Sequence, residues 1–538
     1  MSTSIRKSLA WLHAWAGLVA GWALFMMFLA GTASVFKEEI TAWMSPELGP
    51  GIDAMDALEA AEARLNAVAP DAERWSIRLP SERSPATRIT WRARDASVTE
   101  SEMLDAGSGR VVAARETRGG DLFYRLHYRF EISNPVRRGW WISGAATMFM
   151  LVAIMTGVLT HKRIFRDFFT FRPRAATQRT WLDAHLLLAV PLLPFHLMIA
   201  YTGLVPIMTT VMPWGMIANY GDERPLLEQL ADLDAARRAY SSDRRADPAA
   251  QRPPAHVPSP TVALRSIAEQ AAQQLGGPVG SISVRNPNDA NAVVEVVRRP
   301  GGALSNRPAR LLFDGSTGDP LPVTTSPSPV AKIQAALYGM HMARFADPML
   351  RWAYFAAGLA SSAMIATGLT LWIIKRRRRF TDQTRIPFGH WLVERLNIAA
   401  IVGLPIAMAA YFWANRLLPL DVAARAQLEV RTFFLVWLST LVVAMLRPAD
   451  RAWAEVLGSA AFAFGAIPLL NALTTDRHLV ASVVQGDWLM AGFDSTMAAI
   501  GLLFAWCAVK VAGRARASAA EGTAVPSALD SSTWRSHE

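Results

Sequence analysis

The chain has very little cysteine and few charged residues. Cys507 is its only cysteine, and charged residues make up 18% of its 538 positions. One cysteine permits neither an intrachain disulfide nor a metal site built from thiolates. The sequence also lacks a glycine-rich dinucleotide loop, a Walker phosphate loop, an HExxH motif and a Gly-x-Ser-x-Gly elbow. A flavin or nicotinamide site within this chain is therefore not expected.

Apolar residues are abundant instead, at 52% of the chain, and they gather in long uncharged runs. A helix needs about 20 largely apolar residues to cross the hydrocarbon core of a membrane. The first run lacks a cleavage site of small residues, so we predict a retained span rather than a signal peptide. The pattern predicts a polytopic α-helical membrane protein with about eight transmembrane helices, near residues 10–36, 139–160, 181–207, 350–374, 390–413, 430–446, 453–473 and 488–511.

The net charge of +11 is distributed in a way that indicates membrane topology. Basic residues cluster beside apolar runs, at 161–174, 375–385 and 510–516. Cytoplasmic loops of membrane proteins carry such an excess of lysine and arginine. We therefore expect a bacterial inner-membrane protein with both termini in the cytoplasm and no nucleic-acid partner. The long polar segments, 37–138 and 208–349, would then lie in the periplasm.

The two polar segments share one order of elements. The first has a helical stretch, MDALEAAEARLNAV (55–68), then strand-like pieces and the turn LDAGSGRVV (104–112). The second has TVALRSIAEQAAQQL (261–275), then strand-like pieces and the turn LFDGSTGDPL (312–321). Turns rich in Asp, Ser, Thr and Gly favour hairpins. Each segment is predicted to form a small α+β domain, and residues 220–258 are predicted to be a linker.

The repetition continues into the apolar runs. His13 precedes Gly31 by 18 residues, and His185 precedes Gly203 by the same number. An equal spacing in two spans indicates that the membrane part of the chain is duplicated together with the polar segments.

A second pair of matching stretches follows the polar segments. FYRLHYRF contains His127 and ALYGMHMARF contains His341, and each leads into a span that ends in Thr-Gly, at Thr156–Gly157 and Thr367–Gly368. We interpret residues 8–380 as two copies of span, domain and span. The predicted layout is a cytoplasmic start and first span at 1–38, a first external domain at 39–138, two spans at 139–207, a second external domain with its linker at 208–349, a fourth span at 350–380, four additional spans at 390–511 and a cytoplasmic tail at 512–538.

This order, with the stretches THKRIFRDFFTFRP (160–173), RTWLDAH (179–185) and LPFHLMIAYTGL (193–204), resembles the PepSY-associated transmembrane family of bacterial inner-membrane proteins. The resemblance covers about 380 residues and implies that the two α+β domains are PepSY-like. Some members of the family are siderophore reductases that hold two haems and reduce ferric iron on the periplasmic side. Others are known only as iron-regulated membrane proteins. The four additional spans occur in a longer subgroup, and the resemblance implies no role for them.

The run at 181–207 carries two histidines, His185 and His196. A continuous helix would separate them by about 16.5 Å and only about 20° of rotation, because each residue advances 1.5 Å and 100°. They would face one direction at two depths, which is the geometry needed to ligate two stacked haems. Pro191 and Pro194 lie between them and favour a kink. The alternative is that both are buried histidines bonded to backbone or hydroxyl groups.

The cytoplasmic-side candidates are His13, His161 and His185, which lie at the inner ends of the first three spans. A haem on this side would take His185 together with either His13 or His161. His161 adjoins Lys162 and Arg163, so it is also explained as part of the basic boundary. Ligation by two histidines fills both axial positions of a haem, which then carries electrons rather than binding oxygen.

The periplasmic-side candidates are His196, His127 and His341. A haem on this side would take His196 together with either His127 or His341. Two alternatives remain open here: His127 and His341 could hold a metal or a ferric chelate at the membrane surface, and Met340 or Met342 could supply a thioether ligand.

Arginines near the inner haem position have two interpretations. Arg172, Arg174 and Arg179 could pair with haem propionates, because a guanidinium group suits a carboxylate, or they could serve only as a topology signal. Asp183 lies two residues before His185, so it cannot share its face. It is expected to cap the helix start or to orient a neighbouring histidine.

The sequence thus favours an inner-membrane dihaem electron-transfer protein, an oxidoreductase with two haem b groups. It would reduce ferric iron in a siderophore or other ferric chelate at the periplasmic face, with electrons from a cytoplasmic donor or membrane quinol. One alternative is a haem-free PepSY-type membrane sensor or scaffold. The other is a chelate transporter, which is less favoured because such proteins carry charged or broken helices at the membrane midplane and the last four spans offer little of this.

Overall fold

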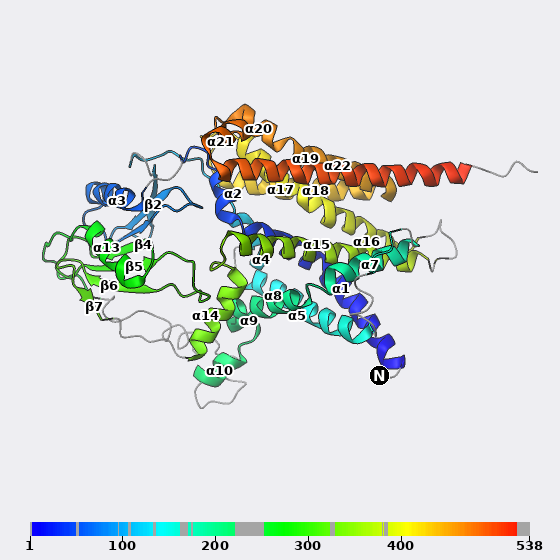
Figure 1. Cartoon of the computed structure of the whole chain (residues 1–538), viewed down its shortest axis with the longest axis horizontal. Coiled ribbons are helices and arrows are strands. Elements are labelled where there is room, and N and C mark those ends of the chain that lie inside the picture. The colour runs from blue at the N-terminus through cyan, green and yellow to red at the C-terminus, as the bar shows by residue number, and fades with distance from the viewer. Residues whose placement is uncertain are drawn as a thin grey trace, which may run out of the picture.

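The computed structural model describes residues 3–49, 53–94, 96–105, 109–132, 136–161, 170–173, 176–220, 252–322, 329–378, 380 and 386–523. Long helices run alongside one another as a bundle, and a sheet with its own helices adjoins one end of them (Figure 1). We call this end of the helices the sheet side and the end that holds the N-terminus the terminal side. The protein is a polytopic α-helical membrane protein.

Eight spans of the described chain are long and apolar enough to cross a membrane, which confirms the predicted number. The first four spans are α1 (Thr3–Ser34), α5 (Val136–Thr160), the region of α8 (Leu193–Leu204) and α15 (Pro348–Arg377). The last four begin with α16 (Phe388–Ile398), a π-helical turn at Ala399–Gly403 and α17 (Leu404–Leu417), and continue with α18 (Arg425–Leu446), α19 (Ala449–Gly465) with α20 (Ile467–Thr474), and α22 (Trp488–Thr523).

The third span differs from the single helix expected at 181–207. Helix α7 (Thr177–Ala189) ends before Pro191, and α8 begins at Leu193 with Pro194 in its first turn. Proline cannot donate a backbone hydrogen bond, and its ring clashes with the preceding turn, so two prolines three residues apart divide the helix. His185 and His196 therefore lie on two different helices, and the phase relation calculated for a continuous helix does not hold.

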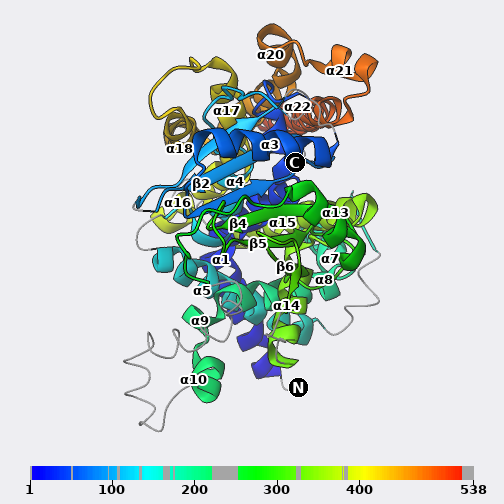
Figure 2. The same cartoon turned by 90° about the vertical axis from the view of Figure 1, so that its left-hand side faces the viewer.

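Among the described residues, the strands of the two polar segments form one antiparallel sheet of seven strands in the order β3-β2-β1-β4-β5-β6-β7. The first segment supplies β1 (Arg74–Arg78), β2 (Thr87–Arg92) and β3 (Glu100–Leu104). The second supplies β4 (Val279–Arg285), β5 (Val293–Arg298), β6 (Arg310–Asp314) and β7 (Pro320–Leu321). Both predicted α+β units are present. They share a single sheet because β1 pairs with β4, with Ser76 opposite Ser283 (Figure 2).

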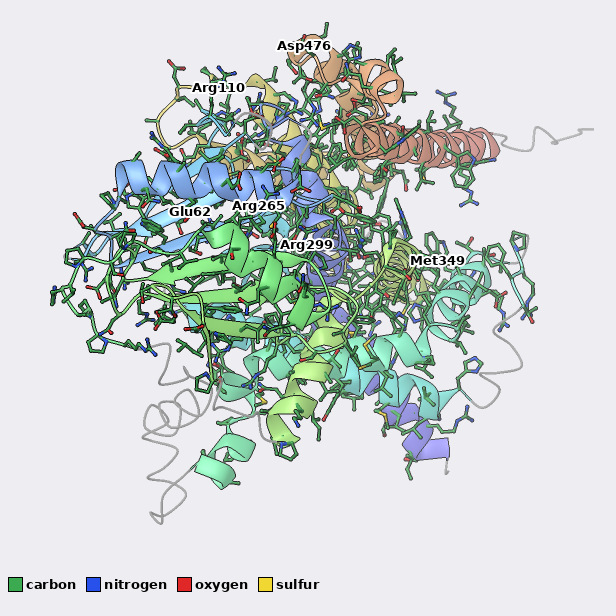
Figure 3. All side chains as sticks on the ribbon, turned by 60° about the vertical axis from the view of Figure 1, so that its left-hand side comes forward. Glu62, Arg110, Arg265, Arg299, Met349 and Asp476 are labelled. Carbon is green, nitrogen blue, oxygen red and sulfur yellow. The ribbon has the colours of Figure 1, made fainter. Side chains whose placement is uncertain are left out.

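Two helices, α3 (Ala54–Val68) and α13 (Leu264–Leu275), cover the same face of this sheet and share its core. Alternating residues of the strands, such as Trp75 and Ile282, point into that core and are fully buried. The two helices also contact each other through the Glu62 carboxylate, which accepts a hydrogen bond from the Leu264 backbone N–H at 3.0 Å. Arg265 forms ion pairs with acidic residues of α3 in the same region (Figure 3).

The turn of the second unit follows its predicted chemistry. The Asp314 side chain accepts hydrogen bonds from the backbone N–H and the hydroxyl of Ser316, at 3.0 and 2.7 Å. Gly318 adopts a φ of +79°, a left-handed conformation that glycine takes without a steric penalty.

Short helices connect the sheet with the spans. These are α2 (Lys37–Trp43), α4 (Asp121–Arg129), α9 (Met208–Val211), α10 (Trp214–Tyr220) and α14 (Pro329–Met342), with a 3-10 turn at Val205–Ile207. A further short helix, α21 (Leu479–Gln485), joins α20 to α22. Helices α4 and α14 carry the histidines that follow each external unit, and both lie at the sheet side of the spans (Figure 1).

Candidate functional site: two histidine pairs

His127 on α4 and His341 on α14 form a pair at the sheet side. Their Nε2 atoms are 3.5 Å apart, and their rings are stacked with centroids 5.8 Å apart. The two residues occupy equivalent positions of the two repeats. The structure therefore joins the repeats at this point.

Each imidazole of this pair is fixed by the span at which its own repeat begins. The Nδ1 atom of His127 donates to the Met27 carbonyl at 2.7 Å. The ring of His341 donates to the Ile199 carbonyl, and its Nδ1 atom lies 3.3 Å from the Thr202 hydroxyl. Because a carbonyl oxygen can only accept, the ring nitrogen that faces it must carry the proton.

Glycines allow these histidines to approach the spans. A Cβ atom on Gly31 would lie 2.6 Å from Nδ1 of His127, and one on Gly203 would lie 2.9 Å from Cε1 of His341. Non-bonded heavy atoms do not approach so closely, so any side chain at these two positions would displace an imidazole. The glycines found at equal spacing in the sequence thus have a steric function.

His13 on α1 and His185 on α7 form a second pair at the terminal side. Their ring centroids are 6.5 Å apart with an interplanar angle of 75°. The Nδ1 atom of His13 donates to the Ala153 carbonyl at 2.8 Å, and that of His185 donates to the Met364 carbonyl at 3.0 Å. The two pairs are therefore built on one plan.

The imidazoles of this second pair pack against the Thr-Gly motifs. A Cβ atom on Gly157 would lie 3.1 Å from the His13 ring, and one on Gly368 would lie 3.2 Å from the His185 ring. The hydroxyl of Thr367 lies 3.2 Å from Nδ1 of His185. The sequence showed these motifs as part of the repeat, and their function becomes evident only from the packing.

The arrangement leaves Nε2 of each paired histidine available to a metal. A ligating histidine is typically oriented by a hydrogen bond from its other ring nitrogen to a carbonyl, which fixes the tautomer. Burial lowers the pKa of His127 and lowers that of His341 to about 3, so both are neutral at physiological pH. Neutral imidazole is the form that binds metals.

A cavity of about 400 Å³ surrounds the sheet-side pair. Apolar and aromatic side chains form most of its wall, and cationic side chains lie among its lining residues. The apolar part includes Leu24, Met27, Phe28, Met150, Phe195 and Ile199, and the cations are Lys37, Arg83, Arg344 and Arg351. Of these cations, Arg83 and Arg351 both pair with Glu39, at 2.6 and 3.1 Å.

His196 and His161 belong to neither ring-to-ring pair, although His196 interacts electrostatically with His185. His196 is buried on α8, with Nε2 at 2.9 Å from the Ser361 hydroxyl and a ring hydrogen bond to the Ala189 backbone. The expected pairing of His196 with His127 or His341 is therefore not formed. His161 follows the end of α5, and its Nδ1 atom has no hydrogen-bond partner among the residues that the structure describes.

The arginines expected near the inner haem have a protein partner. Arg172 and Arg179 lie 3.1 and 2.9 Å from the buried carboxylate of Asp183. Asp183 therefore anchors the start of α7, two residues before His185. Arg174 lies outside the described residues. Of the two methionines beside His341, Met342 lines the cavity, whereas the Met340 carbonyl accepts a hydrogen bond from Tyr354.

The last four spans carry more buried charge than expected. Arg416, Arg425, Glu429 and Asp494 are each at most 6% exposed. These side chains lie near span ends at the sheet side, where they contact residues 41–48 and 115–120, rather than at the middle of their spans. Their hydrogen bonds to protein groups explain why isolated charges in these apolar sequences are tolerated.

The eight spans of the described chain, the α+β sheet and the two partly buried histidine pairs define a duplicated α-helical membrane protein. Residues 10–375 match the family of PepSY-associated TM regions, and the chain belongs to this family. The chain is also similar to an uncharacterized protein of Pseudomonas aeruginosa, with 25% identity over 411 residues that cover 73% of this chain and 95% of that protein.

Proposed function

We propose that this protein transfers electrons across a membrane through two haem b groups and reduces ferric iron in a chelate at the sheet side. The observation that supports this proposal most directly is that the same histidine arrangement occurs twice. Four histidines from equivalent positions are fixed through one ring nitrogen and lie in two pairs.

The residues present fit haem. His127 and His341 would hold one haem, because their Nε2 atoms lie 3.5 Å apart and their other ring nitrogens are bonded to the protein. The apolar cavity suits a macrocycle, while cations such as Arg344 suit propionates. When bound, haem supplies a one-electron carrier, and the protein contributes ligands, orientation and an apolar environment.

The two pairs are well separated along one helix. His13 lies on α1, and Met27 of the same helix holds His127. Fourteen residues of helix correspond to about 21 Å, so two cofactors rather than one would be held. A pair near each end of the same spans supports a path in series from the terminal side to the sheet side.

The acceptor and the donor belong to this proposal. A ferric siderophore or another ferric chelate would receive electrons near the sheet-side pair, which the family resemblance supports. The electrons would come from a cytoplasmic donor or from membrane quinol at the terminal side. The proposal places the terminal side in the cytoplasm of a bacterial inner membrane and the sheet in the periplasm.

A reduced-minus-oxidised absorbance spectrum of the detergent-purified protein tests the proposal. We expect the spectrum of low-spin haem with two histidine ligands and two haems per chain. If the protein is expressed with haem supplied and the purified protein holds none, the proposal is contradicted and a sensor or scaffold is favoured. A ferric chelate that does not reoxidise the reduced protein would contradict the reductase step alone.

A further inference from the structure

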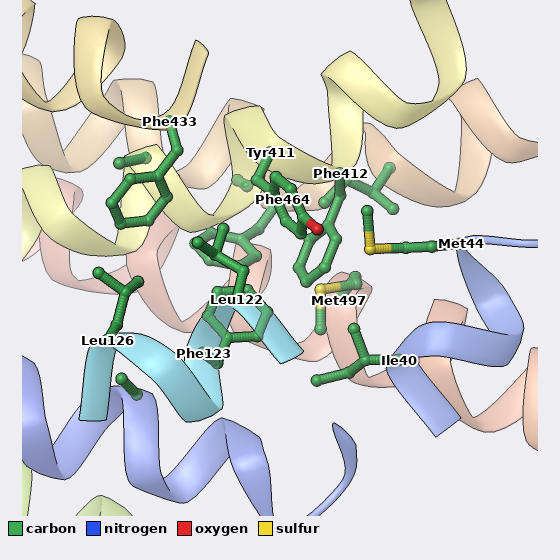
Figure 4. Close-up of a cluster of buried hydrophobic side chains, with 14 of the residues drawn as sticks. Ile40, Met44, Leu122, Phe123, Leu126, Tyr411, Phe412, Phe433, Phe464 and Met497 are labelled. Carbon is green, nitrogen blue, oxygen red and sulfur yellow. The ribbon is translucent and has the colours of Figure 1, made fainter. Parts of the chain in front are cut away.

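The two helices that carry the sheet-side histidines are equivalent in the repeat, but their surroundings differ. Leu122, Phe123 and Leu126 of α4 are completely or almost completely buried, in a cluster with residues of the last four spans (Figure 4). The ring of Phe123 lies edge-on to both Tyr411 and Phe412, at 5.8 Å each.

Helix α14 is held by its own external unit. The backbone N–H of Asn306 donates to the Ala335 carbonyl at 2.9 Å. Gly339 lies so close to the Leu304 carbonyl that no side chain fits there. The last four spans thus break the symmetry of the repeat, because they cover the helix that carries His127.

The segment that leads into α4 is also fixed by α17 and α18. Tyr411 donates to the Gly119 carbonyl at 3.0 Å, and Nη1 of Arg425 donates to the Glu116 carbonyl at 3.2 Å. The Thr117 hydroxyl donates to the Glu429 carboxylate at 2.6 Å. These bonds fix the backbone over the residues that immediately precede α4.

At the centre of these bonds is an ion pair between Arg425 and Glu429, whose side chains are both completely buried. A buried ion pair is tolerated only when further hydrogen bonds satisfy both groups. Asn415 supplies two of them: its Nδ2 donates to Glu429 at 2.8 Å, and its backbone carbonyl accepts from Arg425 at 2.6 Å. Thr117 and Glu116 supply two more, and the Pro419 carbonyl accepts from Nε of Arg425 at 3.2 Å, so the ion pair and the segment before α4 stabilise each other.

A second set of bonds connects helix α2 to the same spans. The guanidinium of Arg416 lies 3.7 Å above the Trp43 ring and donates to the Trp43 carbonyl at 2.6 Å. Asp494 accepts from the Trp43 indole at 2.9 Å. Gly120 approaches the Lys37 carbonyl so closely that any Cβ atom would clash, so α2 and the start of α4 form one unit.

We propose that the last four spans clamp α4 and thereby position His127, with Glu429, Arg425 and Tyr411 as positioning residues. This inference rests on the proposed function. The clamp gives a role to the additional helices: it holds one imidazole of the sheet-side pair by a support that the other imidazole lacks. The environment and the reduction potential of the sheet-side haem then depend on residues that never touch it.

Two variants test the clamp from opposite sides of one hydrogen bond. Glu429→Gln removes the carboxylate, and Thr117→Val removes the hydroxyl with little change of shape. Arg447→Met is the matched control, because Arg447 directly follows the end of α18 and pairs with Glu455 of α19 at 2.7 Å, with side chains that are 51% and 39% exposed. In a redox titration, Glu429→Gln and Thr117→Val should shift one of two haem midpoints, and Arg447→Met should shift neither.

The midpoint that shifts is assigned with His13→Ala, which should lack the terminal-side haem. The clamp predicts that the shifted midpoint is the one that remains in His13→Ala. A shift of the terminal-side midpoint, an equal shift of both, or no shift in either variant would overturn the positioning role.

Hydrogen exchange separates failure of the clamp from failure of the haem assignment. Peptides that cover residues 115–129 should exchange faster in Thr117→Val and Glu429→Gln than in the parent protein. Peptides of the sheet should be unchanged in both variants. If the parent protein holds no haem, the proposed function fails, but this measurement still tests the clamp. Unchanged exchange at 115–129 in both variants would refute it.

Discussion

The Nε2 atoms of His127 and His341 lie 3.5 Å apart, although 214 positions separate the two residues in the chain. Each imidazole is fixed by the first span of its own repeat, and each lines the sheet-side cavity. Two neutral imidazoles that face one another across a repeat boundary, with their Nδ1 protons committed to the protein, are ready to share one metal centre.

The first prediction separates the paired histidines from the unpaired one. Under the proposed function, His341→Ala should lower haem content from two to one per chain, because it removes one of the two histidines that would hold the sheet-side haem. His196→Ala should leave haem content unchanged and should lower stability by about 1–3 kcal/mol, the cost of leaving a buried polar partner unsatisfied. Haem-to-protein ratios and thermal unfolding of both variants measure this difference. If His196→Ala loses one haem, His196 is a haem ligand and the prediction is wrong.

The second prediction concerns the glycine against which the His127 ring packs. Gly31→Ala places a Cβ atom 2.6 Å from the His127 ring, so it should cost about 1–3 kcal/mol, as overpacking does, and should reduce sheet-side haem. Gly17 lies on the same helix, and a Cβ atom there meets nothing within 4 Å. Gly17→Ala is therefore the matched control and should be neutral or stabilising by up to about 1 kcal/mol. Equal haem content in both variants would argue against a steric role for Gly31.

The sequence predicted much of the fold because its signals were local. The uncharged apolar runs predicted the spans. The equal spacing of His13–Gly31 and His185–Gly203 indicated the duplication. The broken third span was not predicted, because the phase of His196 depends on how Pro191 and Pro194 redirect the chain. The spacing of histidines along one span predicts how deep each lies in the membrane. It does not predict which histidine of another helix each will face. The pairing of His127 with His341 therefore required the tertiary structure.

The shared sheet and the clamp were missed for a similar reason. Pairing of β1 with β4 joins segments about 200 residues apart, and no local pattern specifies such a pairing. In the sequence, Arg425 and Glu429 look like ordinary charges at the start of a span. Their complete burial depends on contacts with Glu116 and Thr117.

The third prediction concerns acid stability of the sheet. Burial opposes ionisation of Asp314, but hydrogen bonds from Ser316 and Arg252 outweigh it and hold the pKa of Asp314 below its ordinary value. Its ionised form stabilises the fold above the unfolded pKa of about 3.9, and this stability is lost as the pH falls through the folded pKa. Asp314→Asn should cost about 1 kcal/mol at neutral pH and should flatten the loss of stability below about pH 4. Asp319→Asn, in the same turn but exposed, is the control; unfolding at pH 3 to 7 measures both.

The fourth prediction concerns topology. Reporter fusions after Ala263 should report the periplasm, and fusions after Pro173 should report the cytoplasm, because basic residues flank the spans near 161–174. The opposite result would reverse the direction of electron transfer in the proposal while leaving the histidine pairs as they are.

The last prediction tests whether the two pairs act in series. His185→Ala should remove the terminal-side haem and leave the sheet-side haem, because His127 and His341 are held by other residues. Reduction of a ferric chelate that depends on a membrane donor should fall to the background rate. Dithionite bypasses the terminal side, however, so the haem that remains should still be reoxidised by the chelate at nearly the parental rate. His127→Ala should lose both reactions, because it removes the haem from which the chelate takes its electron. Stopped-flow absorbance with each donor measures the four rates. If His185→Ala lost the dithionite-driven reaction as well while keeping one haem, the chelate would be reduced at the terminal-side pair, and the order of the series would be wrong.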